Sequence, residues 1–281
     1  MSIHLSGLNI FPIKSARGIP LQQAQAEYRG LSHDRRWMVV DANNRFLTQR
    51  TLPNLALIQV RVSPQTLELS TFGQPPLVIP IPGEPADTQG ADSQADVKQT
   101  LVEVEVWGDR CLALSCGQAA ANWLSQALGT PCRLVYMPPS THRPIDHGKF
   151  SQDHLDHGVS FADAYPYLLI SEASLEDLNQ RLASPVPMNR FRPNLVVQGC
   201  AAFAEDRWKT IRIGAITFQI AKPCSRCVIT TVDQDHATRS PEPIKTLATY
   251  RAWEGKIWFG QNLLPLNEGT LHRGDRVEVL A

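Results

Sequence analysis

The sequence shows no excess of charge, no long apolar run and no dense set of cysteines. Its 27 lysines and arginines equal its 27 aspartates and glutamates, so composition gives no electrostatic case for nucleic acid or an anionic membrane as a partner. No apolar run reaches the length of a membrane span, and the first residues lack the basic, apolar and small-residue succession of a signal peptide. Six cysteines in 281 residues do not resemble a disulfide framework. We therefore expect a soluble, cytoplasmic protein.

Several common cofactor and nucleophile motifs are also missing. The chain has no Walker loop, no dinucleotide-binding fingerprint and no nucleophile elbow. It also lacks the Cys-x4-Cys-x2-Cys run of a plant-type iron–sulfur cluster. These absences argue against a P-loop ATPase, a nicotinamide dehydrogenase, an α/β-hydrolase and an iron–sulfur protein.

Most of the chain has the pattern of short strands, because apolar and polar residues alternate in runs bounded by proline, glycine or asparagine. Strands are predicted at residues 4–12, 34–41, 46–50, 55–62, 66–71, 77–81, 101–107, 111–114, 133–137, 195–197, 211–220 and 228–232. Two helices are expected, one over 117–128 that stops at Gly129 and one that Ser171 caps, with Glu172 in its first turn. The predicted fold class is mainly β with a few helices (α+β), with a barrel-like architecture. The polar stretch 83–100 is expected to be a flexible excursion.

The stretch 221–233 joins two cysteines and two cations to a β-branched run. A structural zinc site would need a second pair of closely spaced ligands, which the sequence lacks. A dithiol redox centre would precede a helix, whereas a β-branched run follows Cys227. In a third interpretation, one thiolate is the single protein ligand of a soft metal whose other ligands come from an organic cofactor, and Lys222 and Arg226 favour that thiolate. An inert pair, Cys224 and Cys227, in a tight connection between two strands fits the spacing equally well.

Three separate segments place basic side chains at the ends of predicted strands. Basic and hydroxyl side chains beside free backbone N–H groups are what a phosphate requires, although solvated loops are a commoner origin of such clusters. The residues concerned are Lys14, Ser15 and Arg17, then Arg35 and Arg36, then Arg190 and Arg192.

The stretch 138–158 is rich in proline, histidine and aspartate. Its histidines are His142, His147, His154 and His157. Their spacings fit neither a helix face nor a zinc finger, so we expect a mobile polar loop beside a site rather than a zinc centre.

The motifs FPIKSARG, DRRW, FADAYPYLLISEASLEDLN, MNRFRPNLVV and PCSRCVITTVD follow one another in a recognisable order. The chain resembles the MOSC-domain proteins that carry a MOSC N-terminal β-barrel domain, in the branch that includes the mitochondrial amidoxime reducing component and its bacterial counterparts. The resemblance covers almost the full length. It implies a MOSC-type β-barrel fused to an N-terminal β-barrel-like domain, which we divide as residues 1–115 and 116–281.

The resemblance also implies a chemistry. Family members bind the molybdenum cofactor, a molybdenum with a pyranopterin dithiolene, and reduce N-hydroxylated compounds such as hydroxylamines, amidoximes and N-hydroxylated bases. The family's molybdenum-ligating cysteine falls on Cys227, which makes it the metal ligand and the catalytic residue. Cys224 is then a supporting residue, and Cys200 matches a second family cysteine whose role stays open.

The family's contacts to the cofactor fall on positions scattered along the chain. Mitochondrial members carry Thr-Ser where this chain has Ala164 and Tyr165, so phosphate recognition there would fall to backbone N–H groups. Ala201 replaces an acidic residue, which argues against a proton relay at that position. The cofactor-binding residues implied by the resemblance are Lys14, Ser15, Arg35, Asp163, Tyr165, Arg192, Asn194 and Arg226.

Reduction of a small N-hydroxylated substrate needs two electrons, and the chain has no redox motif of its own. We therefore expect a separate donor, a ferredoxin-like or cytochrome-type protein with its reductase, at a local basic patch that includes Arg143, Lys149 or Arg239. One alternative is a non-catalytic carrier of the molybdenum cofactor or of sulfur. Another is a thiol–disulfide reductase that uses Cys224 and Cys227.

Overall fold

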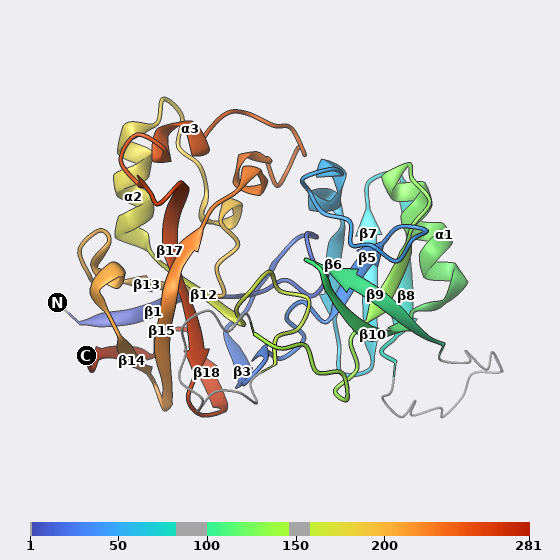
Figure 1. Ribbon diagram of the computed structural model, residues 1–281, viewed down its shortest axis with the longest axis horizontal. Helices are drawn as coiled ribbons and strands as arrows, with labels where there is room; N and C mark the ends of the chain where they lie inside the picture. The colour runs from blue at the N-terminus through green and yellow to red at the C-terminus, as the bar shows by residue number, and fades with distance from the viewer. Residues whose placement is uncertain (1, 83–99, 146–157) are drawn as a thin grey trace.

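The computed structural model describes residues 2–82, 100–145 and 158–281. Figure 1 shows two lobes side by side, one holding both chain termini with α2 and α3, the other holding α1. Lys149, His147, His154 and His157 lie outside the described residues, as does nearly all of the predicted excursion at 83–100. In the described part of the chain, no helix is long and apolar enough to cross a membrane.

The first lobe is a closed barrel. Its strands pair in a ring and are β12 (Tyr167–Ser171), β13 (Leu195–Gln198), β1 (Ile3–Ile10), β19 (Arg276–Val279), β14 (Thr210–Ile213), β15 (Ile216–Ser225) and β17 (Lys256–Pro265). Pairing of β12 with β17 closes the ring. Only β12 and β13 run parallel; their neighbours in the ring are antiparallel. Alternate side chains point inward, so Leu5, Tyr167, Phe218 and other apolar residues form one buried core.

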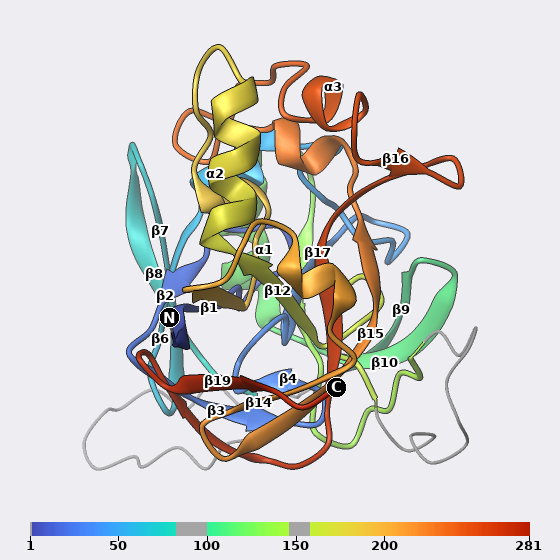
Figure 2. The same ribbon diagram turned by 90° about the vertical axis from the view of Figure 1, so that its left-hand side faces the viewer.

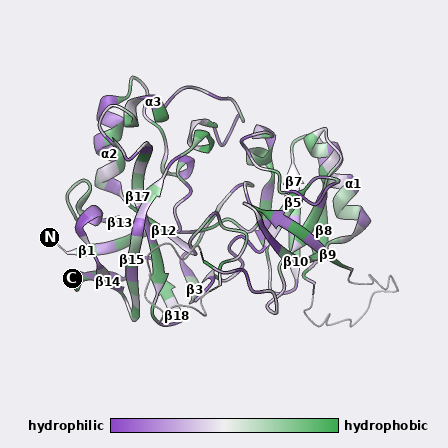
Figure 3. Ribbon diagram, in the orientation of Figure 1, coloured by the Kyte–Doolittle hydropathy of each residue, from purple (hydrophilic) through white to green (hydrophobic). Residues whose placement is uncertain are grey.

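The second lobe is a half-barrel. One of its sheets comprises β5 (Trp37–Val40), β11 (Arg133–Tyr136), β10 (Asp109–Ser115) and β9 (Leu101–Val106); the other comprises β6 (Gln59–Val62), β7 (Thr66–Thr71) and β8 (Gln74–Pro80). Helix α1 (Gly117–Leu128) covers this lobe and packs Trp123 and Leu124 into a core with Trp37. In Figure 3, hydrophobic and hydrophilic residues alternate along β9, as one buried face requires.

Short strands extend the barrel lobe. Strands β3 (Gln23–Glu27), β4 (Gly30–Leu31) and β18 (Gly269–His272) form a small sheet, β2 (Ile19–Pro20) pairs with β1, and β16 (Ala252–Trp253) pairs with β17. Figure 2 shows α2 (Glu172–Arg181) and α3 (Ile244–Leu247) at one end of the barrel lobe and β3 and β4 at the other. Because β1 belongs to the barrel, the chain passes between the lobes more than once. The domain boundary at residues 115 and 116 stays a prediction.

The predicted fold class, mainly β with a few helices and a barrel, is confirmed, and both predicted helices are present. Gly129 ends α1 in the left-handed conformation with φ +64°, which glycine adopts at no steric cost. The Ser171 hydroxyl accepts a hydrogen bond from the Ser174 N–H and caps α2, with Glu172 in its first turn. The short helix α3 was not predicted.

Three strand predictions are wrong in part. Residues 46–50 form no strand, and only Phe46 bridges to Val40. Residues 55–62 begin in the 3-10 helix η1 (Pro53–Leu57), so only β6 is a strand there. The predicted strand 211–220 is two strands, β14 and β15, because the chain turns at Gly214 with φ +55°.

The strand predicted at 228–232 is the 3-10 helix η5 (Val228–Thr231). The β-branched composition favours a strand, but two threonine hydroxyls offer the backbone local partners instead. Thr230 Oγ1 donates to the Cys227 carbonyl at 3.0 Å, and Thr231 Oγ1 donates to the Val228 carbonyl at 2.7 Å. Cys227 therefore lies between a strand end and a 3-10 turn, not between two strands.

Candidate functional site

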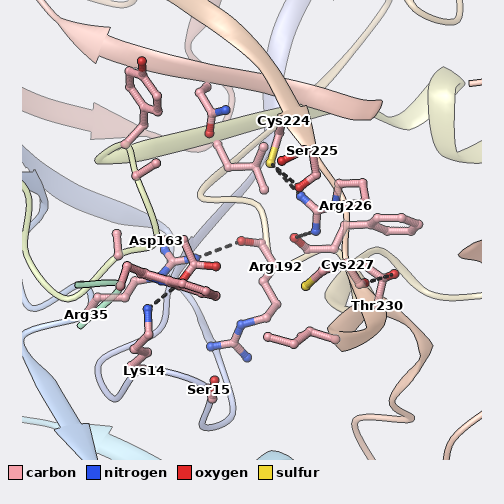
Figure 4. A pocket seen from close by; sticks show the side chains of 18 of the residues that line it. Lys14, Ser15, Arg35, Asp163, Arg192, Cys224, Ser225, Arg226, Cys227 and Thr230 are labelled. Atoms are coloured by element: carbon pink, nitrogen blue, oxygen red, sulfur yellow. Dashed lines mark hydrogen bonds and ion pairs between the residues drawn. The ribbon is translucent and has the colours of Figure 1, made fainter. Parts of the chain in front are cut away.

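A cavity of about 500 Å³ lies where the lobes meet. Figure 4 shows side chains from distant parts of the chain facing this space. Every residue that the sequence analysis assigned to the cofactor or the metal lines it, namely Lys14, Ser15, Arg35, Asp163, Tyr165, Arg192, Asn194, Arg226 and Cys227. The structure thus brings together five segments that are up to about two hundred residues apart, while the role of each residue stays a prediction.

Strand β15 carries the cysteines to the cavity wall. It pairs with β17, and its register shifts between Ile220 and Lys222 and between Pro223 and Ser225. The Arg226 N–H then donates to the Ile257 carbonyl at 2.7 Å, which holds the chain on β17 just past the end of the strand. Cys227 follows at once and η5 turns the chain away. The half-buried sulfur is therefore held on short, well-anchored backbone.

Arg35 and Arg192 form the cationic end of the cavity. Their guanidinium carbons lie 4.5 Å and 4.2 Å from the ring centroid of Phe11. Arg35 donates to Asp34 at 2.6 Å and to the Asn194 side-chain oxygen at 3.0 Å. Both guanidiniums are thus fixed before any ligand binds.

Arg192 is the less satisfied of these two arginines. Its Nη1 donates to the Ala16 carbonyl at 2.6 Å, whereas its Nη2 is buried without a hydrogen-bond partner among the described residues. Burial, and then the neighbouring charge of Arg35, lowers the pKa of Arg192 to about 9. A buried cation with an unused donor is costly unless an anion reaches it.

Lys14 and Asp163 form an ion pair across the cavity. The Lys14 ammonium donates to the Asp163 carboxylate and, at 2.7 Å, to the Phe161 carbonyl. Burial lowers the pKa of Lys14 to about 8, although the charge of Asp163 opposes this shift. Burial alone would raise the pKa of Asp163, but Lys14 and then Arg50 hold it below its ordinary value. Asp163 therefore positions Lys14 and offsets part of its charge.

Asn194 and Ser15 are held by the backbone around them. The Asn194 side chain donates to the Asn9 carbonyl at 3.1 Å and accepts from the Leu168 N–H at 3.3 Å. The Ser15 carbonyl accepts from the Gln49 side chain at 2.7 Å. Both residues are buried at the wall of the cavity.

Strained backbone is concentrated at this site. Positive φ angles occur at four non-glycine residues that line the cavity, and these are Ser15 (67°), Arg35 (50°), Trp107 (57°) and Arg192 (58°). Such conformations cost a side-chain-bearing residue free energy and are retained where surrounding contacts demand them. Three of the four were assigned to the cofactor from the sequence.

Each cysteine sulfur of the 224–227 pair has its own arginine. Arg226 Nη1 lies 3.0 Å from the Cys224 sulfur, and Arg50 Nη2 lies 3.3 Å from the Cys227 sulfur. The sequence suggested Lys222 and Arg226 as the cations beside the sulfurs. Lys222 instead lies over the Tyr165 ring, 4.9 Å from its centroid.

Arg50 is the functional residue that sequence reasoning missed. Its side chain stacks on Trp107, with the guanidinium carbon 4.4 Å from the ring centroid, and lies 3.5 Å from Asp163. Arg239, an exposed residue proposed for partner binding, donates to the carbonyls of Gln49 and Arg50 and so holds this loop. No signal in the sequence marks Arg50, because it belongs to none of the recognisable motifs.

Arg143 does not belong to an exposed basic patch, which corrects the sequence-based expectation. Its side chain is buried, pairs with Asp109 at 2.8 Å, and donates to the carbonyls of Ser160 and Ala162 at 2.9 Å and 2.6 Å. A loop whose carbonyls point inward needs a buried donor, and Arg143 supplies it.

Cys200 lies away from the cavity. It packs at the edge of the barrel core, where burial and then the charge of Glu205 raise the pKa of its thiol. Cys200 is not among the residues that line the cavity.

The cavity fits an anionic metal cofactor in three respects. Of the described residues that line it, seven are lysine or arginine and one is a carboxylate. Arg192 Nη2 and Arg226 Nε are buried without partners among the described residues. Within the described ranges, no group of three histidine, cysteine or acidic side chains forms a metal cluster, so a metal bound by Cys227 would need its other ligands from outside the protein.

Comparison with known proteins adds independent findings. The family model of the MOSC N-terminal beta barrel domain matches residues 2–131, and that of the MOSC domain matches residues 156–278. Mitochondrial amidoxime-reducing component 1 is 35% identical in Mus musculus, over 96% of this chain and 80% of its own length, and 33% identical in Homo sapiens, over 96% and 81%. Molybdenum cofactor sulfurase of Oryza sativa subsp. japonica is 35% identical over 92% of this chain and 32% of its own length.

Proposed function

We propose a function from the family to which this chain belongs, the MOSC-domain proteins that carry a MOSC N-terminal beta barrel domain and include the mitochondrial amidoxime-reducing components. In this proposal, the protein binds the molybdenum cofactor and reduces N-hydroxylated compounds. Hydroxylamines, amidoximes and N-hydroxylated bases form the substrate class. The observation that carries the proposal is one cavity with Cys227 in its wall, Cys224 beside it and a cluster of buried cations around them.

The reaction removes one oxygen atom from nitrogen. The N–OH bond breaks, two electrons and two protons are consumed, and the N–H product and one water are released. The molybdenum cofactor, when bound, would supply the two-electron redox chemistry. The protein supplies position and charge.

The residues of the chain divide these tasks between them. Cys227 supplies the sulfur that binds the metal, and Arg50 donates a hydrogen bond to that sulfur. The guanidiniums of Arg35 and Arg192, with Lys14, neutralise the phosphate of the cofactor, and fixed donors cost little entropy on binding. Ser15, Asn194 and the backbone near Asp163 and Tyr165 complete the binding surface.

Electrons come from a separate carrier in this proposal. The sequence holds neither an iron–sulfur pattern nor a nicotinamide fingerprint, so a ferredoxin-like or cytochrome-type protein with its own reductase would supply them through a small, transient interface. Cysteine usage supports the cytoplasm as the compartment, because all six cysteines are unpaired.

The test is reduction of benzamidoxime to benzamidine by natively purified protein that contains molybdenum and pterin. We expect turnover with chemical reductant and with a ferredoxin and its reductase, and none with reduced nicotinamide alone. A protein that carries the cofactor but reduces no N-hydroxylated compound under either reductant would instead be a carrier of the cofactor or of sulfur. Dithiol activity that survives removal of the metal would identify a thiol–disulfide reductase.

A further inference from the structure

Two lysines of the cavity have no task in the proposed function. Lys222 lies on β15, two residues before Cys224, and Lys256 begins β17; both line the same cavity as Cys227. The Lys222 ammonium lies over the Tyr165 ring, and the Lys256 ammonium lies 5.7 Å from the centroid of the Trp258 ring. In the described part of the chain, neither lysine forms an ion pair with a carboxylate. Both side chains are exposed, so solvent rather than a carboxylate screens their charges.

The position of Lys256 places it near the metal ligand. The Arg226 N–H donates to the carbonyl of Ile257, the residue next to Lys256, and Cys227 directly follows Arg226. Lys222 pairs with Asn262 across the sheet, and Asn262 also lines the cavity. The two lysines therefore belong to the β15 and β17 wall, whereas the cations assigned to the phosphate come from the loop after β1, the segment before β5 and the segment before β13.

Charge balance shows what such a wall would attract. Asp163 is the one carboxylate among the described residues that line the cavity, and Lys14 and Arg50 already engage it. The chain as a whole has a formal net charge of zero, so positive charge is concentrated at this cavity. A concave site of one sign concentrates small ligands of the opposite sign.

We propose that Lys222 and Lys256 make the enzyme selective for N-hydroxylated substrates that carry an anionic group, a carboxylate or a phosphate. The inference rests on the proposed function. Tyr165, Trp107 and Ile229 line the same cavity and supply apolar surface for the uncharged body of such a substrate. A cationic wall beside apolar surface selects an amphiphilic anion over a neutral compound of the same shape.

The experiment compares benzamidoxime with its 4-carboxylate derivative, using molybdenum-loaded protein and a chemical reductant. We expect kcat/KM to be roughly tenfold higher for the carboxylate at low salt, with the preference shrinking as salt is added. Lys222→Met and Lys256→Met should each lower the ratio of the two kcat/KM values, and the double variant should bring it to about one. Lys245→Met, which removes an equal charge on α3 outside the cavity lining, should keep the wild-type ratio.

A binding measurement provides a readout that needs no turnover. Saturation-transfer NMR with 4-carboxybenzamide and benzamide, which carry no N–OH group, should show stronger contact for the carboxylate in wild-type protein and loss of that difference in the double variant. Molybdenum content should stay at the wild-type level in both lysine variants, and depletion would show that the lysines hold the cofactor instead.

The outcomes separate the two claims. Turnover of both amidoximes at equal kcat/KM, with a ratio that the lysine variants leave unchanged, would overturn the selectivity and leave the proposed function standing. Absence of any turnover, with a clear NMR preference for the carboxylate, would overturn the proposed function and retain an anion-binding wall.

Discussion

The Arg50 guanidinium donates to the Cys227 sulfur at 3.3 Å, across a separation of 177 residues. This contact links the half-barrel lobe to the barrel lobe at the residue proposed to bind the metal. A hydrogen bond to a ligating atom tunes the metal site, and its loss typically costs about 10- to 100-fold in affinity or activity.

Arg50→Gln should therefore lower kcat for an N-hydroxylated substrate by at least about tenfold. Arg50→Lys should recover only part of this loss, because a lysine keeps the charge but not the planar stack on Trp107. Steady-state kinetics with measured molybdenum content checks both variants. Arg45→Gln is the matched control, because Arg45 is an exposed residue of the same loop. An equal loss of kcat in that variant would contradict the proposed role of Arg50 as the donor to the Cys227 sulfur.

Arg192→Met should yield folded protein depleted in cofactor. Its charge is buried with an unused donor, so replacing it with an apolar side chain of similar length removes a burial cost while leaving the Phe11 stack partly filled. We expect the apo form to be as stable as wild type in urea unfolding, and the molybdenum content of purified protein to fall severalfold.

Arg212→Ala, on the exposed face of β14, is the control for Arg192→Met because Arg212 pairs with Glu278 at the surface. It should keep the wild-type molybdenum content. Full cofactor occupancy in Arg192→Met would show that the cofactor's phosphate lies elsewhere.

Lys14 predicts a dependence of stability on pH in the apo protein. Its folded pKa is about 8 against 10.5 for the free side chain, so above pH 8 the folded chain releases a proton that the unfolded chain holds until about pH 10.5. Stability therefore rises through this window, by up to about 3 kcal/mol relative to a chain that cannot titrate at this position. Urea unfolding of wild type and Lys14→Met at pH 7.5, about half a unit below the window, and at pH 10, about half a unit inside its upper limit, measures this change.

Burial of Lys14 predicts that stability increases, rather than decreases, as pH rises through this window. A stability difference between wild type and Lys14→Met that is flat over this window, or that moves against wild type as pH rises, would mean that the lysine is not buried in the apo protein. Lys245→Met, whose lysine is exposed on α3, should show no such dependence.

Arg143→Met should destabilise the protein rather than weaken electron transfer. The substitution leaves Asp109 and the carbonyls of Ser160 and Ala162 without their buried donor, a loss of about 3 kcal/mol or more. Thermal unfolding of the variant should show a clear decrease in Tm. If the variant kept the wild-type Tm but was reduced more slowly by a donor protein, Arg143 would instead contribute to a surface that binds the donor.

The sequence was informative where local patterns decide the structure. Helix α1 has the bounds that the sequence predicted. The prediction came from the helical spacing of Ala120, Trp123 and Leu124 and from Gly129, which ends the helix. Strands β7 and β10 were predicted because alternation and turn residues agree there. The nine residues assigned to the cofactor or the metal were proposed through family motifs, since single cations at strand ends have no distinguishing pattern.

Other features depend on contacts that a sequence does not reveal. η5 replaces a strand because Thr230 and Thr231 bond to carbonyls three residues back. Arg143 was taken for a surface cation because only the folded loop shows how many carbonyls it must satisfy. Arg50 was missed because its partners Trp107 and Cys227 come from other segments, one of them in the other lobe.

The central claim is that Cys227 alone binds a molybdenum whose other ligands come from the cofactor. X-ray absorption at the molybdenum edge measures this directly, because it counts sulfur neighbours of the metal. We predict one sulfur fewer in Cys227→Ala than in wild type, and an unchanged count in Cys224→Ala, whose sulfur is held by Arg226. A count that falls in Cys224→Ala and not in Cys227→Ala would contradict the account.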